Sequence, residues 1–124
     1  MSRSLYLLAL YITEHEGSAP VSSGTVAERT DRTAGTVTEA FHDLAATKLV
    51  GYEPHEGAAL TDAGYDRAQQ LHETYVTLSW FFRDVLELPE YEQEAMEMAG
   101  AVSPTVARRL AATLLEEPSQ NGGE

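Results

Sequence analysis

The apolar residues at the start of the chain recur with the spacing of helices. Leu5 and Leu8 lie on one stripe and predict a first helix over 5–15, capped by Ser4. A Gly-Ser-Ala-Pro run then breaks the pattern, and a short second helix is expected near 25–29. A third helix is expected to follow at once.

The third helix and the segment after it give the most specific pattern in the chain. The helix is expected over 33–47, followed by extended arms over 49–53 and 58–61 with a Glu-Gly turn between them. Two helices joined by a short turn and followed by a hairpin form a winged helix-turn-helix. The sequence therefore predicts a winged-helix DNA-binding domain over 1–63 and a mainly α fold with a small β wing.

The second half of the chain predicts helices over 62–88, 89–100 and 104–116, the last one starting at a Ser-Pro signal. The first of these carries a near-heptad apolar seam, which favours helix–helix packing. We therefore predict a helical dimerisation domain over 64–116, a homodimer, and a disordered tail over 117–124. The alternative is that the seam only closes the core of one chain. The expected interface residues are Leu71, Tyr75, Leu78, Phe82, Val85 and Leu110.

Composition narrows the classes of function. The 124 residues contain no cysteine, which excludes disulfides, thiol catalysis and cysteine metal sites. The four histidines lie on separate predicted elements and no glycine-rich phosphate loop is present, so an enzyme is not expected. No apolar run approaches the roughly 20 residues of a membrane span, and the N-terminus does not read as a signal peptide. We expect a cytoplasmic protein with no membrane partner.

The charge of the chain is unusual for a DNA-binding protein. Twenty acidic residues stand against eight basic ones, a net charge of -12, and the acids are spread along the helical segments. In ~1 M salt the Debye length is about 3 Å, so repulsion from DNA is largely screened. The composition therefore indicates a halophilic source.

Several motifs together resemble the diphtheria-toxin-repressor family of metal-responsive regulators. Val26-Ala-Glu-Arg29, Thr36-Val-Thr38 and Leu60-Thr-Asp-Ala-Gly64 match its winged helix, while Phe82-Arg-Asp-Val-Leu-Glu-Leu88 and Val102-Ser-Pro104 match its helical dimerisation domain. The resemblance covers about residues 4–115. It implies a short, haloarchaeal-type member that lacks the metal ligands.

The resemblance places the metal ligands of the family on residues that are unsuited to the task. The matching positions are Leu5, Val76, Trp80, Met96, Ala99 and Gly100. Aliphatic, indole and glycine positions cannot bind a metal, and a lone thioether is too soft for Mn²⁺ or Fe²⁺. We therefore expect a metal-independent regulator with no cofactor. A metal site unlike that of the family, formed by His72, Glu94 or Glu97, stays open.

The resemblance also identifies candidate contacts to double-stranded DNA, with the reading helix over 33–47. Hydroxyls can bond phosphates, and a glutamate on this helix can accept only from a cytosine amino group. The expected DNA-binding residues are Arg29, Arg32, Thr33, Thr36, Thr38, Glu39, His42, Lys48 and His55.

Two other functions remain open at this point. The acids Glu39 and Asp43 on the reading helix also fit a winged helix that has become a protein–protein interaction module. A regulator that senses a small apolar ligand is the other alternative, because the second half of the chain is rich in aromatic and methionine side chains. The residues that could line such a pocket are Tyr75, Trp80, Phe81, Phe82, Met96 and Met98.

Overall fold

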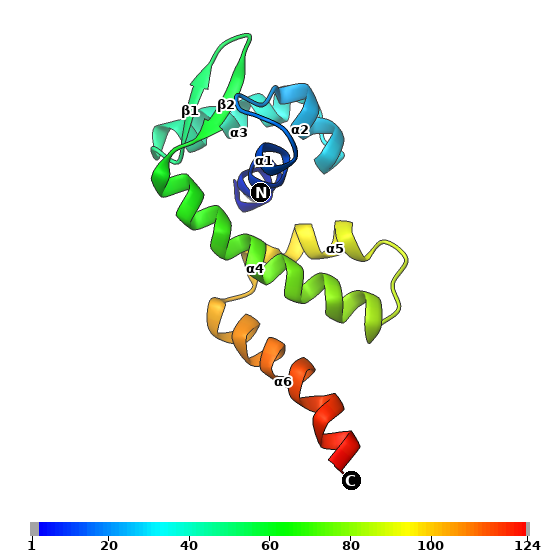
Figure 1. Ribbon diagram of the computed structural model, residues 1–124. Coiled ribbons are helices and arrows are strands. Elements are labelled where there is room, and N and C mark those ends of the chain that lie inside the picture. Colours follow the sequence, from blue (N-terminus) through cyan, green and yellow to red (C-terminus); the bar gives the residue numbers. More distant parts are fainter. Residues whose placement is uncertain (1–2, 124) are drawn as a thin grey trace. The chain divides into compact units, whose positions relative to one another are not determined.

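The computed structural model describes residues 3–123, and the side chains up to residue 114 (Figure 1). Helices make up most of the chain, and two antiparallel strands form one hairpin, so the expected mainly α fold with a small β wing is confirmed. The elements are α1 (Arg3–Glu16), α2 (Ser23–Thr30), α3 (Ala34–Ala46), β1 (Val50–Glu53), β2 (Gly57–Leu60), α4 (Asp62–Asp84), α5 (Tyr91–Met98), the short 3-10 helix η1 (Ala99–Ala101) and α6 (Pro104–Gly123).

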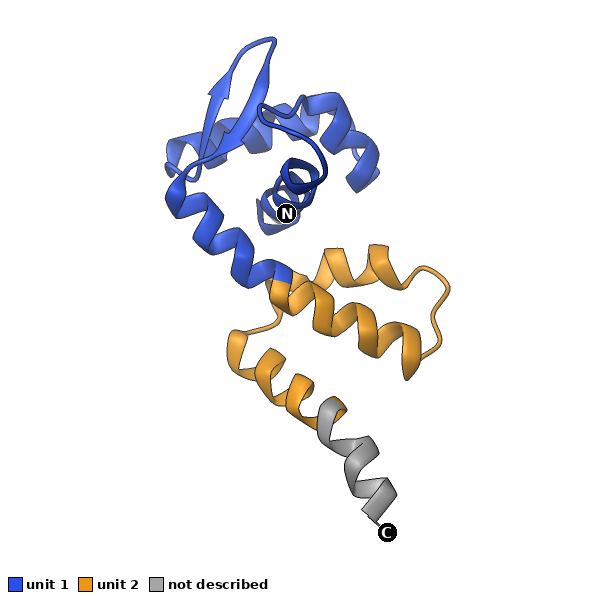
Figure 2. Cartoon of the chain, viewed as in Figure 1, with its two compact units in different colours: residues 1–72 blue, residues 73–124 orange. Residues whose placement is uncertain are grey.

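The chain forms two compact units, which are coloured separately in Figure 2. The N-terminal unit comprises residues 1–72 and the C-terminal unit residues 73–124. Helix α4 contributes its first half to the N-terminal unit and its second half to the C-terminal unit. The sequence places a boundary after residue 63, at the start of this helix, whereas the compact units meet within it.

The core of the N-terminal unit is built around α1. Seven consecutive residues of this helix, Leu5 to Tyr11, are buried, and the helix contacts α2, α3 and β2. A helix that is buried on every side needs apolar residues all around, not one stripe. The single stripe predicted from Leu5 and Leu8 is therefore too narrow, and Ser4, expected as the cap, lies inside the helix.

Strand β2 of the hairpin is paired along both of its edges. The two strands pair in register from Val50 opposite Leu60 to Glu53 opposite Gly57, and Val21 forms an isolated bridge with Ala58 on the other side of β2. The two amides of that bridge donate to carbonyls at 2.8 and 2.9 Å. The hairpin was expected from the sequence, whereas this third extended segment was not.

Gly57 is the residue that permits the close approach of the two segments. Its φ is +123°, and a Cβ there would lie 2.0 Å from the carbonyl oxygen of Val21. Only glycine combines this backbone angle with such proximity. The Glu-Gly turn predicted from the sequence therefore has a second role, which is to bring β2 against residue 21.

The C-terminal unit has a small core of its own. Leu78, Phe82 and Ala95 are buried together, and half-buried apolar residues pack around them. These surrounding residues are Tyr75, Phe81, Leu88, Tyr91, Val102 and Leu110. The hydroxyl of Ser103 accepts a hydrogen bond from the amide of Val106 at 3.2 Å, which confirms the predicted Ser-Pro start of α6.

Helix α4 ends at Asp84, four residues before the predicted end, and Val85 is 49% exposed. The amides of Val85 and Leu86 both bond to the carbonyl of Phe81, and Glu87 has a φ of +57°. A proline at residue 89 disfavours helical geometry in the residue before it. The predicted placement of Val85 on the inner stripe is therefore wrong.

The last helical turn of α4 carries an ion pair between neighbours. Arg83 bonds both carboxylate oxygens of Asp84, at 2.8 and 3.2 Å, and lies 5.8 Å from the ring centroid of Tyr91. Hydrogen bonding from the guanidinium lowers the pKa of the Asp84 carboxyl. Both groups are exposed, so the pair orients the turn that leads into α5 and adds little stability.

Helix α6 continues to Gly123, seven residues beyond its predicted end at residue 116. The predicted disordered tail over 117–124 falls in this last part of the helix, where side chains are not described, and its last residue lies outside the described residues. It stays a prediction. None of the described helices combines the length and hydropathy needed to cross a membrane.

The backbone contact at the start of α4 gives a first prediction. A Cβ on Gly64 would lie 1.8 Å from the carbonyl oxygen of Leu49, and neither atom belongs to a flexible side chain. Gly64→Ala should therefore lower the free energy of unfolding by about 2 kcal/mol or more, measured by urea denaturation. Gly51→Ala is the matched control, because a Cβ there meets nothing within 4 Å. Equal stability of the two variants would contradict the close contact.

Candidate nucleic-acid interface

Helices α2 and α3 are joined by the short turn of a helix-turn-helix motif. Asp31, which ends α2, has a φ of +58°, and the amide of Arg32 bonds to the carbonyl of Ala27 at 3.0 Å. Thr33 then caps α3, with its hydroxyl accepting from the amide of Thr36 at 3.2 Å. Helix α3 therefore begins within one residue of its predicted start at residue 33.

The burial pattern of α3 determines which side faces outward. Its inner positions are Val37, Ala40, Phe41 and Leu44, all buried. Glu39 and His42 are exposed and Thr36 is half-buried, so three of the predicted DNA-binding side chains lie on the outward side. This side is the candidate reading surface of the chain.

His42 connects the candidate reading surface with the wing. Its ring meets the ring of Tyr52 edge to face, with centroids 4.9 Å apart, and Tyr52 belongs to β1. Phe41 lies 6.0 Å from the same tyrosine ring. The wing is therefore packed against the side of α3, as a winged helix requires.

Thr38 has a different environment from the one the sequence predicts. Its hydroxyl lies 2.9 Å from the hydroxyl of Ser23, the first residue of α2, and its side chain is half-buried. The bond connects the two helices of the motif. Thr38 is therefore placed to set the position of α3 relative to α2.

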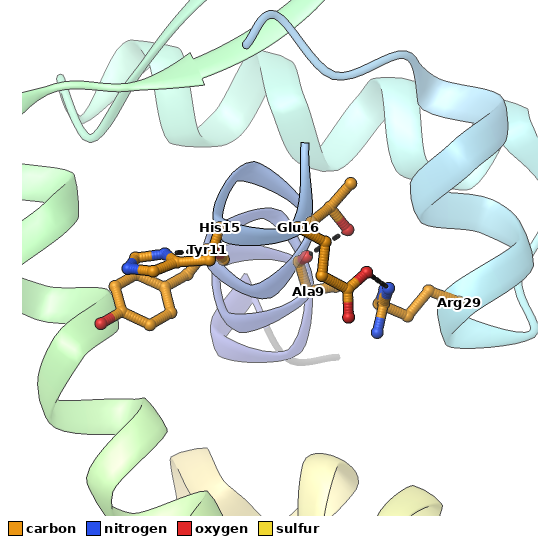
Figure 3. Close-up of polar contacts among 6 residues, drawn as sticks. Ala9, Tyr11, His15, Glu16 and Arg29 are labelled. Carbon is orange, nitrogen blue, oxygen red and sulfur yellow. Dashed lines mark hydrogen bonds and ion pairs between the residues drawn. The ribbon is translucent and has the colours of Figure 1, made fainter. Parts of the chain in front are cut away.

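The predicted cations are spread over several elements. Arg29 forms an ion pair with Glu16 at the end of α1, as Figure 3 shows, and Arg32 donates to the carbonyl of Thr30 at 2.9 Å. Lys48 follows the C-terminal end of α3, about 20 Å from its start at 1.5 Å per residue. His55 lies in the exposed turn of the wing, with a φ of +71°. The structure does not gather these groups around the first turn of α3.

Two glycines that the sequence interpretation overlooked occupy equivalent places in α2 and α3. Gly24 and Gly35 are each the second helical residue after a hydroxyl cap, and a Gly-Thr-Val run starts at both. A Cβ on Gly35 would meet nothing within 4 Å, so the fold does not require glycine there. Glycine leaves the amides of a helix start accessible to an anion. The repeated run is visible in the sequence and is the signal that could have identified them.

The predicted dimer residues fall into three groups. Leu78 and Phe82 are buried in the core of the C-terminal unit, with Tyr75 and Leu110 half-buried against it, and Leu71 is buried in the N-terminal unit. Val85 is exposed. The large apolar residues that are exposed in the C-terminal unit are Val76, Trp80, Val85, Leu86, Met98 and Val106.

The open candidates for a metal site are divided between the two units, with His72 in the N-terminal unit and Glu94 and Glu97 in the C-terminal unit. Within the described residues, no group of three or more histidine, aspartate or glutamate side chains is close enough to hold a metal ion. The ring of His72 lies 5.2 Å from that of Tyr11, and the carboxylate of Glu97 accepts from Gln93 at 3.2 Å. Glu94 lies exposed in α5.

Most of the residues that could line an apolar ligand pocket in the second half of the chain are packed against other side chains. Tyr75, Phe81 and Phe82 fill the core of the C-terminal unit, and Met96 is buried. Trp80 and Met98 are partly exposed, at 37% and 41%. The aromatic richness noted in the sequence is thus used largely for packing.

The chain resembles a known protein in sequence over most of its length. No family model matches the chain. An uncharacterised helix-turn-helix-type transcriptional regulator of Methanocaldococcus jannaschii is 28% identical over 114 residues, which cover 89% of this chain and 91% of the relative.

Several solved structures resemble the chain over most of its length. The manganese regulator SloR has a TM-score of 0.74 at 24% identity, and the metal-dependent transcriptional regulator MtsR 0.73 at 23%. IdeR of T. acidophilum has a TM-score of 0.72 at 14% identity. The matches cover 90%, 91% and 92% of this chain but 53%, 53% and 54% of those chains. The chain therefore spans about half the length of these structures.

These structures belong to regulators of the diphtheria-toxin-repressor family. Their likeness shows that this chain has the fold of that family, a winged helix followed by further helices. The resemblance read from the sequence motifs is confirmed at the level of the fold.

The bond between Ser23 and Thr38 gives a second prediction. Thr38→Val and Ser23→Ala should each lower the free energy of unfolding by about 1 kcal/mol, because each removes one neutral hydrogen bond. The double variant should lose less than the sum, since the two hydroxyls share that bond. Urea unfolding of the four proteins measures this coupling, and the control is Thr113→Val, at an exposed position of α6 where the hydroxyl bonds only to the Arg109 carbonyl of its own helix. Strict additivity would show that the hydroxyls do not interact.

Proposed function

We propose that this chain is a transcriptional regulator of the diphtheria-toxin-repressor type that binds specific sequences of double-stranded DNA. The observation that carries the proposal is the outward side of α3, where Thr36, Glu39 and His42 lie beside the wing. A helix of this kind enters the major groove with its first turns, and its polar side chains contact base edges. The fold and the archaeal relative support the same function.

The proposed reading chemistry relies on hydrogen bonds more than on charge. Glu39 can accept from the amino group of cytosine, and the hydroxyls of Thr33 and Thr36 can bond to phosphate or contact a thymine methyl. Arg29, Arg32, Lys48 and His55 are assigned to the phosphate backbone around this surface. Because few phosphates would be neutralised, affinity should depend only weakly on salt.

The acidic surface of the chain fits the same proposal in a cytoplasm of high salt. The net charge is -12, and repulsion between DNA and exposed acids such as Glu39 and Asp43 is large in dilute buffer. At ~1 M salt that repulsion is screened within about 3 Å, while directed hydrogen bonds persist. We therefore assign the protein to a halophilic organism.

We further propose that the regulator acts as a homodimer without a metal. Two half-sites of an operator require two reading helices at a fixed separation. The exposed apolar residues of the C-terminal unit offer a surface for that contact, with Trp80 as its largest member. In the resemblance, Val76 and Trp80 occupy positions of metal ligands, so metal is not expected to control binding.

A second candidate function is a winged helix that binds another protein. Two carboxylates, Glu39 and Asp43, are exposed on α3, and the surrounding surface is acidic. Such a surface would suit a basic protein partner better than a phosphate backbone. The next experiment distinguishes these two functions.

Changing Glu39 tests the DNA-reading function. Glu39→Gln should redirect the preference at one base pair from cytosine to adenine, because an amide can donate and accept, with a change in discrimination of ~1–3 kcal/mol. Selection of bound duplexes from a randomised pool, in ~1 M KCl with chelator, measures the preference.

The matched control is Asp43→Asn, which makes the same chemical change one turn further along α3 and should leave that base pair unaltered. Mn²⁺ added in place of the chelator should not raise the affinity. If neither the wild type nor the variant enriches any sequence, the protein-binding function is favoured.

The oligomeric state gives a separate prediction. The chain should sediment as a dimer at micromolar concentration in molar KCl, and Trp80→Glu should shift it toward the monomer, because a charge would be buried in the contact. Gln69→Glu adds the same charge to an exposed position of α4 in the N-terminal unit and should leave the dimer intact. A wild-type protein that sediments as a monomer would refute the dimer.

A further inference from the structure

The N-terminal unit contains a pocket of about 700 Å³ away from the first turn of α3. Its wall is formed by the start of α1, the end of α3, the segment before β1 and one turn of α4. The lining residues are Arg3, Ser4, Leu7, Leu44, Thr47, Leu49 and Arg67. The volume lies within the range of small-molecule binding sites.

The floor of this pocket is apolar and rigid. Leu7 and Leu44 are 2% and 1% exposed, because each is also packed in the core of the N-terminal unit, and Leu49 is half-buried beside them. Side chains held in this way cannot collapse to fill the space. The pocket therefore offers a preformed apolar surface, with the hydroxyls of Ser4 and Thr47 at its sides.

The charge of the pocket is opposite to that of the chain. It contains two of the eight basic residues of a chain with twenty acids, and no acid lines it. Arg29 and Arg83 are paired with carboxylates in other parts of the structure. The side chains of Arg3 and Arg67, by contrast, make no ion pair or hydrogen bond with any residue that the structure describes. Two arginines without a carboxylate, above a leucine floor, are arranged for an external anion.

We infer that this pocket binds an organic carboxylate with an apolar tail. The planar guanidinium groups of Arg3 and Arg67 match a carboxylate through paired N–H donors. The tail would lie on Leu7, Leu44 and Leu49, where it removes apolar surface from water. A free phosphate would contact the arginines and leave the leucines exposed, and a fully apolar ligand would contact the leucines and leave the arginines without an anion.

The site is separate from the proposed reading surface. Leu44 and Thr47 lie at the C-terminal end of α3, whereas Thr33 and Thr36 lie at its start, roughly 12 to 21 Å away along the helix. Binding of the carboxylate does not depend on the proposed DNA function. A failure of DNA binding and a failure of ligand binding are therefore distinguishable.

Calorimetric titration of the full chain with decanoate, below its micelle concentration, tests the inference. One saturable site per chain is expected. Acetate, which lacks the tail, and decyltrimethylammonium, which has the tail and a positive charge, should give no saturable binding. Absence of saturable decanoate binding, or equal binding of the cation, would overturn the inference.

Variants then locate the site. Arg67→Gln and Arg3→Gln should each weaken decanoate binding by roughly 5- to 10-fold, the loss of one charge-assisted pair at a partly exposed site. Arg109→Gln, which removes the same charge from an exposed position in α6, should leave affinity unchanged. Because all three residues are exposed, the variants should fold, and far-UV circular dichroism confirms this.

Amide chemical shifts give an independent map of the bound probe. Saturating decanoate should move the resonances of Leu7, Thr47 and Leu49 most in the wild-type chain. Largest shifts in the C-terminal unit, or equal weakening by Arg109→Gln and Arg67→Gln, would overturn the assignment of the site.

Discussion

The burial of the middle of α1, from Leu5 to Tyr11, is the constraint on which the N-terminal unit depends. Helices α2 and α3 and strand β2 all contact this helix, so their relative positions are set by one apolar surface. Its last turns are polar and attach two neighbours individually: Glu14 accepts a hydrogen bond from the amide of Leu60 in β2 at 2.8 Å, and Glu16 pairs with Arg29 of α2. The middle of α1 thus supplies the burial energy, and its end fixes the wing and the first helix of the motif.

Hydroxyl groups make many of the connections that ion pairs make in other proteins. Ser22, Thr33 and Ser103 cap three helices, and Ser23 bonds Thr38 across the helix-turn-helix. Neutral hydrogen bonds of this kind are little affected by salt, whereas exposed ion pairs lose most of their small contribution when the Debye length falls to a few Å. The same logic applies to the proposed reading surface, so the hydrogen bonds within the fold and those of the proposed DNA contact would both persist in concentrated salt.

The sequence predicted the features that arise from neighbouring residues. The starts of α3 and α6, the hairpin and the order of elements depend on local chemistry, and each is found at or within a residue of its expected place. Two features that the sequence did not predict depend on contacts between distant segments: the hydrogen bond between Thr38 and Ser23 and the bridge from Val21 to β2. The exposure of Val85 follows instead from the early end of α4. The apolar repeat in the sequence extended the predicted helix to residue 88. Such a repeat does not reveal where a turn ends the helix, and here that turn lies before Pro89.

The corner between the wing and α4 connects the features that local patterns could not reveal. The amide of Thr61 bonds to the carbonyl of Leu49 at 3.1 Å, and its hydroxyl bonds to the carbonyl of Lys48 at 2.8 Å. Gly64 packs directly on the same backbone. Leu49 therefore directly precedes the first strand of the wing and contacts the start of α4. It also lines the pocket that contains Arg3 and Arg67. A carboxylate bound there would contact the segment that joins α3 to the wing, so its binding free energy would act on the two elements that flank the proposed reading surface.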